Sequence, residues 1–194
     1  MHPVTHLLLS WTVADAVKSQ PRDRALVTWC GVAPDLDGLG ILLDFGNALL
    51  GRPAEWHYHQ FHHLLTHGLP AALMIPGLLC LLARQRLWVF LLGFCVFHIH
   101  LLCDLVGARG PSASDLWPIY YLAPVTRHPM LVWTHQWRLD GWQNLVVTVA
   151  LLAIAFRSAI RRGYSPVSLF SAKVDQAVVH ALRKRWQAMR GGKE

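Results

Sequence analysis

The sequence predicts an all-α fold: a polytopic membrane helical bundle of three to four membrane helices, with irregular capping loops and a basic amphipathic C-terminal helix. Two features of the composition favour this class. Hydrophobic residues make up 54% of the 194 residues, and charged residues only 15%, well below the quarter that is typical of soluble domains. The length fits one domain, so any chemistry must be built from the helices and their connecting loops.

Three apolar stretches predict the membrane helices, over residues 69–83, 87–106 and 142–156, the last with a polar extension to 160. The first and third are shorter than the roughly 20 residues that span the hydrocarbon core, so we expect tilt or local thinning of the bilayer. Residues 5–17 are apolar but interrupted by polar residues, which favours a partly buried or interfacial helix. Residues 25–33 are apolar but too short to span.

Two irregular regions lie between these stretches. Residues 34–60 mix Pro, Gly, Asp and aromatic residues without a clear period, apart from the apolar residues 39–50, which predict a short helix. Residues 107–141 are rich in Pro and Trp, and Trp is enriched at membrane boundaries. We expect both regions to cap the bundle.

The C-terminal part of the chain is basic. The formal net charge is +7, and Lys and Arg residues crowd after residue 156. Within residues 171–189, a helical period predicts one apolar face, formed by Val174, Ala177, Val178, Ala181, Leu182 and Trp186. This pattern favours a helix lying on a membrane with anionic headgroups, although a solvated tail with helical tendency is the alternative.

We therefore divide the chain into a membrane-embedded domain, residues 1–156, and a basic tail, residues 157–194. Membrane lipids are the expected partners. The basic charge lies beyond the last apolar stretch, so we expect no nucleic acid partner. The sequence does not indicate an oligomeric state.

Histidine and aspartate residues gather at the boundaries of the apolar stretches. The clusters are His6; Asp35 and Asp37; His57, His59, His62, His63 and His67; and His98, His100 and Asp104. Imidazole and carboxylate groups together bind borderline divalent metal ions, zinc first, with manganese or iron as alternatives. The clusters contain no thiolate, which favours a catalytic site over a closed structural one.

The spacing within the clusters predicts convergence. His63 and His67 are four residues apart, as are His100 and Asp104, so each pair shares one helical face. Helical arms of equal length lead from His67 to the turn at Arg84–Arg86 and back to the region of Asp104. We therefore expect the His67 and Asp104 ends to lie at one membrane depth, opposite the turn.

Each of these residues also has a simpler interpretation. A single His or Asp at a helix end more often caps the helix or contacts water than binds a metal. Asp35 and Asp37 follow a proline and are compatible with a simple turn. Asp104 differs, because a carboxylate within an apolar helix is costly unless it is paired, so a functional role is its default interpretation. His128 and His135 lie outside the clusters and are expected at the surface.

These motifs together resemble the YdjM-like family of membrane-bound metal-dependent hydrolases. The resemblance covers roughly residues 1–156 and rests on Thr5-His6-Leu7, Pro34-Asp35-Leu36-Asp37, His62-His63-x-x-Thr66-His67-Gly68, His100-x-x-x-Asp104, Leu116-Trp117-Pro118, Trp137 and Trp142-Gln143-Asn144. It implies an integral protein of the bacterial inner membrane with hydrolase activity, and a His/Asp pattern distantly similar to zinc-dependent phospholipase C proteins.

By position, the resemblance implies a metal site formed by His6, Asp35, His62, His67, His100 and Asp104, with Asp37 and His63 close by. The chain departs from the family pattern at one place. The family often has Arg and Gly after the first His of the third motif, where this chain has His63 and Leu64. His63 is therefore either a ligand or a replacement for a cation that binds substrate.

The leading functional hypothesis is metal-assisted hydrolysis of an amphiphilic ester at the headgroup level, either a phosphodiester or a lipid ester. Asp37 is the predicted general base, with His63 as a second catalytic residue. Two alternatives remain open: a non-catalytic membrane protein that binds a metal ion or haem, and a structural membrane protein whose polar cluster holds helices together. Polar residues at one end of the helices, rather than along them, favour the enzyme.

The distribution of positive charge predicts the orientation. The Arg84–Arg86 turn and the tail together carry most of the Lys and Arg residues, and the remainder are assigned to the side of the His/Asp clusters. Cytoplasmic loops carry an excess of Lys and Arg. The site is therefore expected to face away from the cytoplasm.

Overall fold

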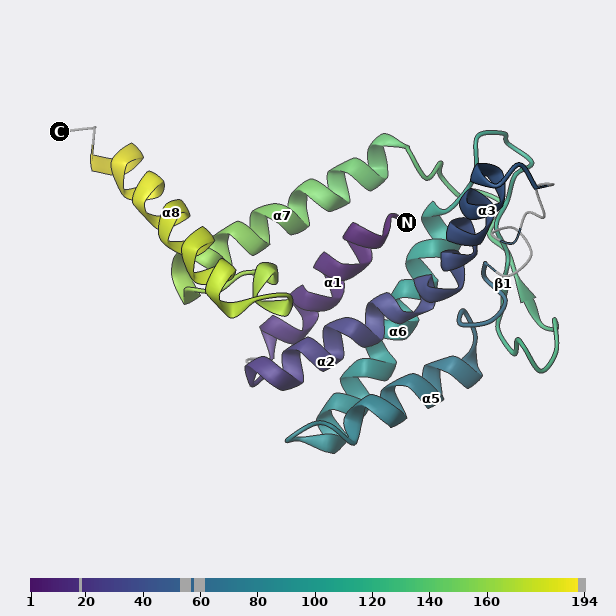
Figure 1. The fold of residues 1–194 in the computed structure, drawn as a ribbon, viewed down its shortest axis with the longest axis horizontal. Helices are drawn as coiled ribbons and strands as arrows, with labels where there is room; N and C mark the ends of the chain where they lie inside the picture. The colour runs from purple at the N-terminus through teal and green to yellow at the C-terminus, as the bar shows by residue number, and fades with distance from the viewer. Residues whose placement is uncertain (18, 53–56, 58–61, 192–194) are drawn as a thin grey trace.

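The chain folds into a helical bundle, and the computed structural model describes residues 1–17, 19–52, 57 and 62–191 (Figure 1). Its helices are α1 (Pro3–Ala16), α2 (Pro21–Val32), η1 (Ala33–Leu39), α3 (Gly40–Leu49), α5 (Leu69–Cys80), α6 (Arg86–Gly107), α7 (Trp142–Arg162), η2 (Pro166–Leu169) and α8 (Ala172–Gly191). Among the described residues, the only sheet is an antiparallel pair, β1 (Ile119–Tyr120) and β2 (Met130–Leu131). The predicted all-α membrane bundle is confirmed.

Three helical segments are long and apolar enough to cross a membrane: Pro21–Leu49, Arg86–Gly107 and Trp142–Arg162. The last two were predicted. The helix predicted over residues 69–83 is present as α5, but it ends at Cys80 and is shorter than these three. The expectation that residues 25–33 are too short to span was wrong, because η1 continues the helix through Pro34 into α3.

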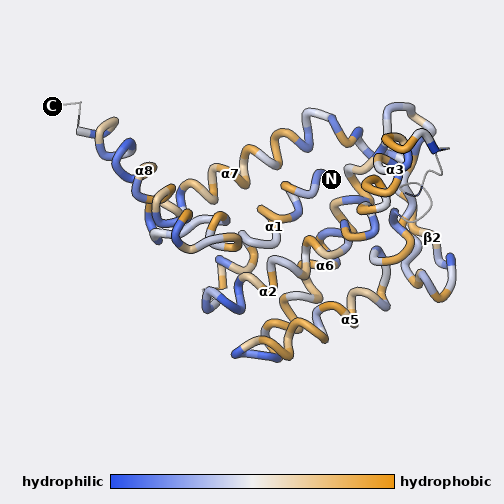
Figure 2. Tube along the Cα trace, viewed as in Figure 1, coloured by the Kyte–Doolittle hydropathy of each residue, from blue (hydrophilic) through white to orange (hydrophobic). Residues whose placement is uncertain are grey.

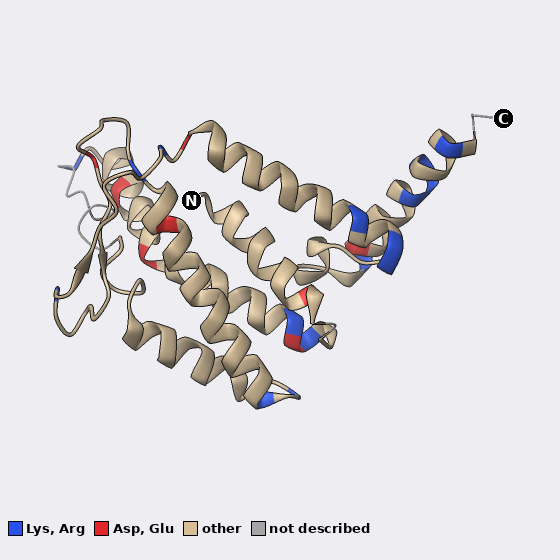
Figure 3. Cartoon of the chain, turned by 180° about the vertical axis from the view of Figure 1, so that it is seen from behind, with Lys and Arg blue, Asp and Glu red and all other residues tan. Residues whose placement is uncertain are grey.

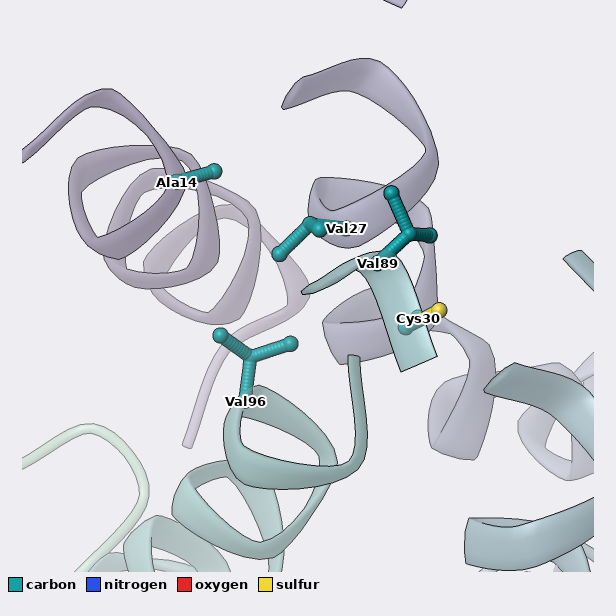
Figure 4. Packing of buried hydrophobic residues seen from close by; sticks show 5 residues of the cluster. All are labelled: Ala14, Val27, Cys30, Val89 and Val96. Atoms are coloured by element: carbon teal, nitrogen blue, oxygen red, sulfur yellow. The ribbon is translucent and has the colours of Figure 1, made fainter. Parts of the chain in front are cut away.

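The core of the bundle lies where α2 packs between α1 and α6. A cluster of small apolar side chains fills this space, formed by Ala14, Val27, Cys30, Val89 and Val96 (Figure 4). Gly31 allows α1 and α2 to approach closely, because a Cβ atom there would lie 1.9 Å from Ser10 Oγ. The interior is therefore packed tightly by small residues, as in many membrane helix pairs.

Many apolar side chains are exposed on the helices of the bundle, in keeping with a lipid environment, and hydrophobic residues predominate along α3, α5 and α6 (Figure 2). On α7, the exposed side chains include Leu145, Val149 and Leu152. α3 has no buried residue, and it exposes Leu42 and Phe45 among others. Such continuous apolar surface is expected where acyl chains, rather than water, surround the protein.

The bundle has two chemically distinct ends. The end that holds the start of α1 and the C-terminus of α6 is called the site end; the end that holds the α1–α2 and α5–α6 turns is called the turn end. At the turn end, the Asp23 carboxylate accepts hydrogen bonds from the backbone N–H groups of Arg84 (2.9 Å) and Gln85 (3.0 Å). The expectation that all basic residues outside the Arg84–Arg86 turn and the tail lie at the site end is therefore wrong. Arg22 and Arg24 flank Asp23 in the first turn of α2, which these hydrogen bonds place beside the α5–α6 turn. Figure 3 shows basic residues at both of these turns.

The basic tail contains a helix that is anchored to the bundle, and its first residues, 157–162, form the last turns of α7. The predicted helix over residues 171–189 is confirmed as α8. Its first turn is held by Asp175, which accepts a hydrogen bond from the backbone N–H of Ser165 at 3.0 Å. Its middle is held by Arg183, whose Nε donates to the carbonyl of Ile160 at 3.0 Å, near the C-terminus of α7. α8 therefore starts from a defined position before it extends away from the bundle (Figure 1).

Candidate metal centre

Four side chains of metal-ligand type converge at the site end. His6 from α1, Asp35 from η1, and His100 and Asp104 from α6 each offer one ligand atom, and these atoms all lie within 4.8 Å of one another. His6 and His100 are 1% exposed and Asp104 is 2% exposed. Burying a charged group, or a polar group without a hydrogen-bond partner, costs free energy. The cluster therefore requires a partner that offsets this cost.

Asp104 lies at the centre of the group. Its Oδ1 atom is 3.1 Å from His6 Nε2, and its Oδ2 atom is 2.9 Å from His100 Nε2. The same Oδ2 atom is 3.5 Å from His67 Nε2, and Asp35 Oδ1 lies 3.7 Å from His100 Nε2. The i,i+4 spacing of His100 and Asp104 thus places both on one face of α6. There they meet His6 from α1, Asp35 from η1, and His67 from the connection before α5.

The hydrogen bonding of His100 tests whether a cation fits the site. Its Nδ1 atom donates to the carbonyl of Gly31 at 2.8 Å, which leaves a lone pair on Nε2 in the neutral ring. That Nε2 atom is buried without a hydrogen-bond partner and faces the carboxylates of Asp35 and Asp104. A lone pair directed at two carboxylates is repulsive unless a positive charge lies among them, and the amino group of Met1 meets the other Asp104 oxygen, Oδ1, rather than the Oδ2 atom that His100 faces. The donor set therefore fits a metal cation.

Asp37 orients two further histidines. Its Oδ1 atom accepts from His62 Nδ1 at 2.9 Å, and its Oδ2 atom accepts from His67 Nδ1 at 3.0 Å. The backbone N–H of Thr66 also donates to Oδ2, at 3.3 Å. Because Nδ1 is the donor to Asp37 in both rings, each ring would bind a metal ion through Nε2. A carboxylate that fixes the tautomer of an imidazole in this way is typical of the outer shell of a metal site.

His67 lies between two carboxylates. Its ring is fully buried, and its Nε2 atom, which faces Asp104, has no hydrogen bond. Burial alone lowers the pKa of His67, but its contacts with Asp104 and Asp37 raise that pKa to about 9. This position therefore attracts positive charge, either a proton or a metal ion.

His63 has a different environment from its neighbours. Burial lowers its pKa well below the usual range, with a smaller effect from His67, so the ring is neutral at pH 7. Its Nδ1 atom donates to the carbonyl of Pro118 at 3.2 Å, which leaves Nε2 as an acceptor. Its backbone has a φ of 65°, a conformation that is uncommon for residues other than glycine and often marks a functional site.

A cavity of about 290 Å³ opens beside these groups. Its polar lining includes Asp35, His62, His63 and Asp104, and its apolar lining includes Leu39, Ile41, Trp117 and Leu139. The amino group of Met1 also lines the cavity and contacts Asp104. Ligand-type groups on one side and apolar side chains on the other give the cavity room for a molecule with both polar and apolar parts.

The structure brings together all eight site residues that the sequence predicts: His6, Asp35, Asp37, His62, His63, His67, His100 and Asp104. His62, His63 and His67 form a second group of ligand type beside the first. His57 lies elsewhere, 2.9 Å from Asp44, and His59 falls outside the described residues. His128 and His135 are exposed, as expected.

His98 does not join the site, although it belongs to the same sequence cluster as His100. Its Nδ1 atom donates to the carbonyl of Phe94 at 2.9 Å, and its Nε2 atom lies 3.0 Å from the hydroxyl of Tyr121. Both nitrogens are therefore satisfied. Two partners of the site were missed by the sequence analysis, the carbonyls of Gly31 and Pro118, and of these only Pro118 stood in a recognised motif.

One comparison with known proteins, that with family profiles, finds a match. The profile of a family described as YdjM inner membrane protein matches residues 1–165. No curated protein and no solved structure matches the chain.

Proposed function

The chain belongs to the YdjM inner membrane protein family, and from this premise we propose that it is a membrane-bound metal-dependent hydrolase. The observation that carries the proposal is the buried convergence of His6, Asp35, His100 and Asp104, with ligand atoms within 4.8 Å of one another. The unpartnered Nε2 atoms of His67 and His100, both directed at Asp104, support a cation at their centre.

The donor set favours zinc, with manganese or iron as alternatives. The proposed ligands are His6, Asp35, His67, His100 and Asp104, which offer imidazole nitrogen and carboxylate oxygen without a thiolate. Two carboxylates balance the charge of one divalent ion. His62, also expected to be a ligand, lies in the second group, where its Nδ1 atom is held by Asp37.

A divalent ion held there supplies Lewis acidity toward a carbonyl or phosphoryl oxygen. The side chains supply orientation and proton transfer. Both Asp37 oxygens accept hydrogen bonds from histidines, so we assign Asp37 to orienting His62 and His67 rather than to the general-base role predicted for it. His63 takes the base role, because it lines the cavity and keeps Nε2 as an acceptor.

The substrate class follows from the surroundings of the cavity. Leu39, at the end of η1, and Ile41, in the first turn of α3, line it, and the rest of α3 exposes apolar side chains. An ester with an acyl chain is therefore favoured over a small polar ester, since the chain can lie along α3 while the ester reaches Asp104. Phosphodiesters and carboxylic esters of lipids both meet this description.

The orientation of the site remains part of the proposal. Arg22, Arg24, the Arg84–Arg86 turn and the basic residues at the end of α7 all gather at the turn end (Figure 3). By the positive-inside rule, the turn end is cytoplasmic and the site faces the other side. Labelling a cysteine introduced at exposed Ser114 in intact cells tests this, and protection from a membrane-impermeant reagent would contradict it.

Activity assays on the purified protein test the enzyme. We expect turnover of a lipid phosphodiester or a lipid carboxylic ester in detergent micelles, abolished by a chelator and restored by zinc. His100→Gln should lose this activity, whereas the control His98→Gln, two residues earlier on α6, should keep it. A protein that binds metal stoichiometrically but turns over neither ester class would contradict the proposal and favour the non-catalytic metal-binding alternative.

A further inference from the structure

A second candidate site lies at the turn end, far from the metal centre. A groove of about 300 Å³ runs between α7 and α8, lined by Phe156, Arg157, Ile160, Arg161, Trp186 and Arg190. We propose that this groove binds the phosphate group of an anionic phospholipid from the leaflet that surrounds the turn end.

The charge of the groove selects an anion. Arg157 and Arg161 are four residues apart on α7 and point to one face, and Arg190 approaches from α8. Within the described part of the chain, no carboxylate forms an ion pair with any of these three. The neighbouring Arg162 shows the contrast, because it pairs with Asp15 at 2.8 Å. Guanidinium groups bind phosphate through paired hydrogen bonds.

The apolar part of the groove selects a lipid over a free anion. The rings of Phe156 and Trp186 meet edge to face, with centroids 5.8 Å apart, and each residue is 37% exposed. Ile160 completes this apolar wall. Indole and phenyl rings beside cationic side chains are typical of the membrane interface, where headgroup and acyl chain meet.

The groove lies at the level where a headgroup is available. α7 is a candidate membrane span, and its exposed residues Val149 and Leu152 lead along the helix toward Phe156. The arginines follow in the last turns of that span. A lipid seated in the groove therefore keeps its acyl chains along α7 and its phosphate among the arginines.

The geometry of the groove is fixed by the chain itself. α7 ends at Gly163, which has a φ of 83°, and the chain turns there toward α8. Arg183, in the middle of α8, donates to the carbonyl of Ile160 near the end of α7, and Asp175 in the first turn of α8 accepts from Ser165 in the connection between the two helices. The two walls thus face each other before any lipid binds.

Lipid retention tests the proposal. The full chain is reconstituted into phosphatidylcholine vesicles that contain a minor fraction of phosphatidylglycerol, extracted in detergent, and weighed with its bound lipid by native mass spectrometry. The site variant Arg157→Gln, Arg161→Gln, Arg190→Gln is compared with the control Lys173→Gln, Lys184→Gln, Arg185→Gln. The control removes the same charge from exposed positions of α8 outside the groove.

We expect the wild type and the control to retain phosphatidylglycerol in preference to phosphatidylcholine, and the site variant to lose that preference by roughly tenfold or more. Equal losses in both variants would mean diffuse attraction and would overturn the site. Displacement of the lipid by inorganic phosphate at equal concentration would overturn the lipid assignment in favour of a soluble phosphate. Circular dichroism verifies that each variant is folded. If the triple variant unfolds, the double variant Arg157→Gln, Arg161→Gln replaces it, because it leaves α8 unchanged. The same loss of preference for phosphatidylglycerol is expected of the double variant, and an unchanged preference would overturn the site.

Discussion

His67 and Asp104 come from opposite arms of the α5–α6 hairpin, and their Nε2 and Oδ2 atoms lie 3.5 Å apart. The opposite ring nitrogen of His67 is held by Asp37 at 3.0 Å. His67 therefore links a carboxylate that orients it to a carboxylate that lies among the proposed ligands. Most of the predicted behaviour of the site depends on this arrangement.

Asp37→Asn should weaken metal binding without unfolding the protein. An amide has a single acceptor oxygen, so it can hold only one of His62 and His67 in its present tautomer. Loss of an outer-shell carboxylate typically costs about 10–100-fold in metal affinity, and we expect a loss in that range from competition with a fluorescent chelator. The control is Asp140→Asn, an exposed carboxylate paired with Arg138. Wild-type affinity in Asp37→Asn would rule out the orienting role.

His63→Gln should separate metal binding from catalysis. Because His63 is proposed as a proton acceptor and not as a ligand, the variant is expected to bind metal normally. Its turnover should fall by about 10²–10⁴-fold, as for the loss of a general base. Metal content and hydrolysis are measured on the same preparation. Loss of the metal would instead identify His63 as a ligand, and unchanged turnover would remove it from the mechanism.

Metal affinity should rise with pH up to about 9. The raised pKa of His67, about 9 against a usual 6.5, means that the metal-free folded protein holds a proton there. This proton stabilises the metal-free fold fully below pH 6.5, and the stabilisation is lost as the pH rises through about 9. The metal ion must displace it, so binding releases a proton. Calorimetry in buffers of different ionisation enthalpy measures that release, and zinc binding at pH 7.5 without proton release would contradict the assignment.

Gly31→Ala should damage both the packing and the site. The new methyl group would lie 1.9 Å from Ser10 Oγ and force α1 away from α2, at a cost of about 1–3 kcal/mol in the free energy of unfolding. Because α1 carries His6 and the Gly31 carbonyl holds His100, metal affinity should fall as well. Thermal unfolding and chelator competition measure the two effects. Gly46→Ala, whose added Cβ meets nothing within 4 Å, is the control; an equal effect there would refute the argument.

The parts of the fold that follow from local pattern were predictable. The apolar runs of α6 and α7 identify two spans, and the equal arms around the Arg84–Arg86 turn predict that His67 and Asp104 meet, as they do. The predicted members of the site could be named because imidazole and carboxylate are rare within apolar stretches. The family resemblance added the order of the motifs, and the match over residues 1–165 confirms the family.

The parts that depend on tertiary packing were not predictable. The candidate span Pro21–Leu49 contains Asp35 and Asp37, where the sequence analysis divided it, and only the backbone shows that α2, η1 and α3 form one continuous helical path. The i,i+4 spacing from Asp104 singles out His100 by sequence, but the partner of His98, the hydroxyl of Tyr121, follows only from the tertiary packing. The roles of the Gly31 and Pro118 carbonyls could not be predicted either. Every residue has a backbone carbonyl, so the residue type does not show which carbonyl accepts a hydrogen bond.

The measurement that tests the central claim most directly is the metal content of the protein purified in detergent, determined by inductively coupled plasma mass spectrometry. It compares the wild type with the double variant His67→Ala, Asp104→Ala and with the control His128→Ala, Asp140→Ala, whose residues are exposed. We predict stoichiometric zinc, manganese or iron in the wild type and the control, and its loss from a still-helical double variant. A wild-type protein that contains no metal and cannot be reconstituted with any of the three ions would contradict the metal centre and leave a structural polar cluster.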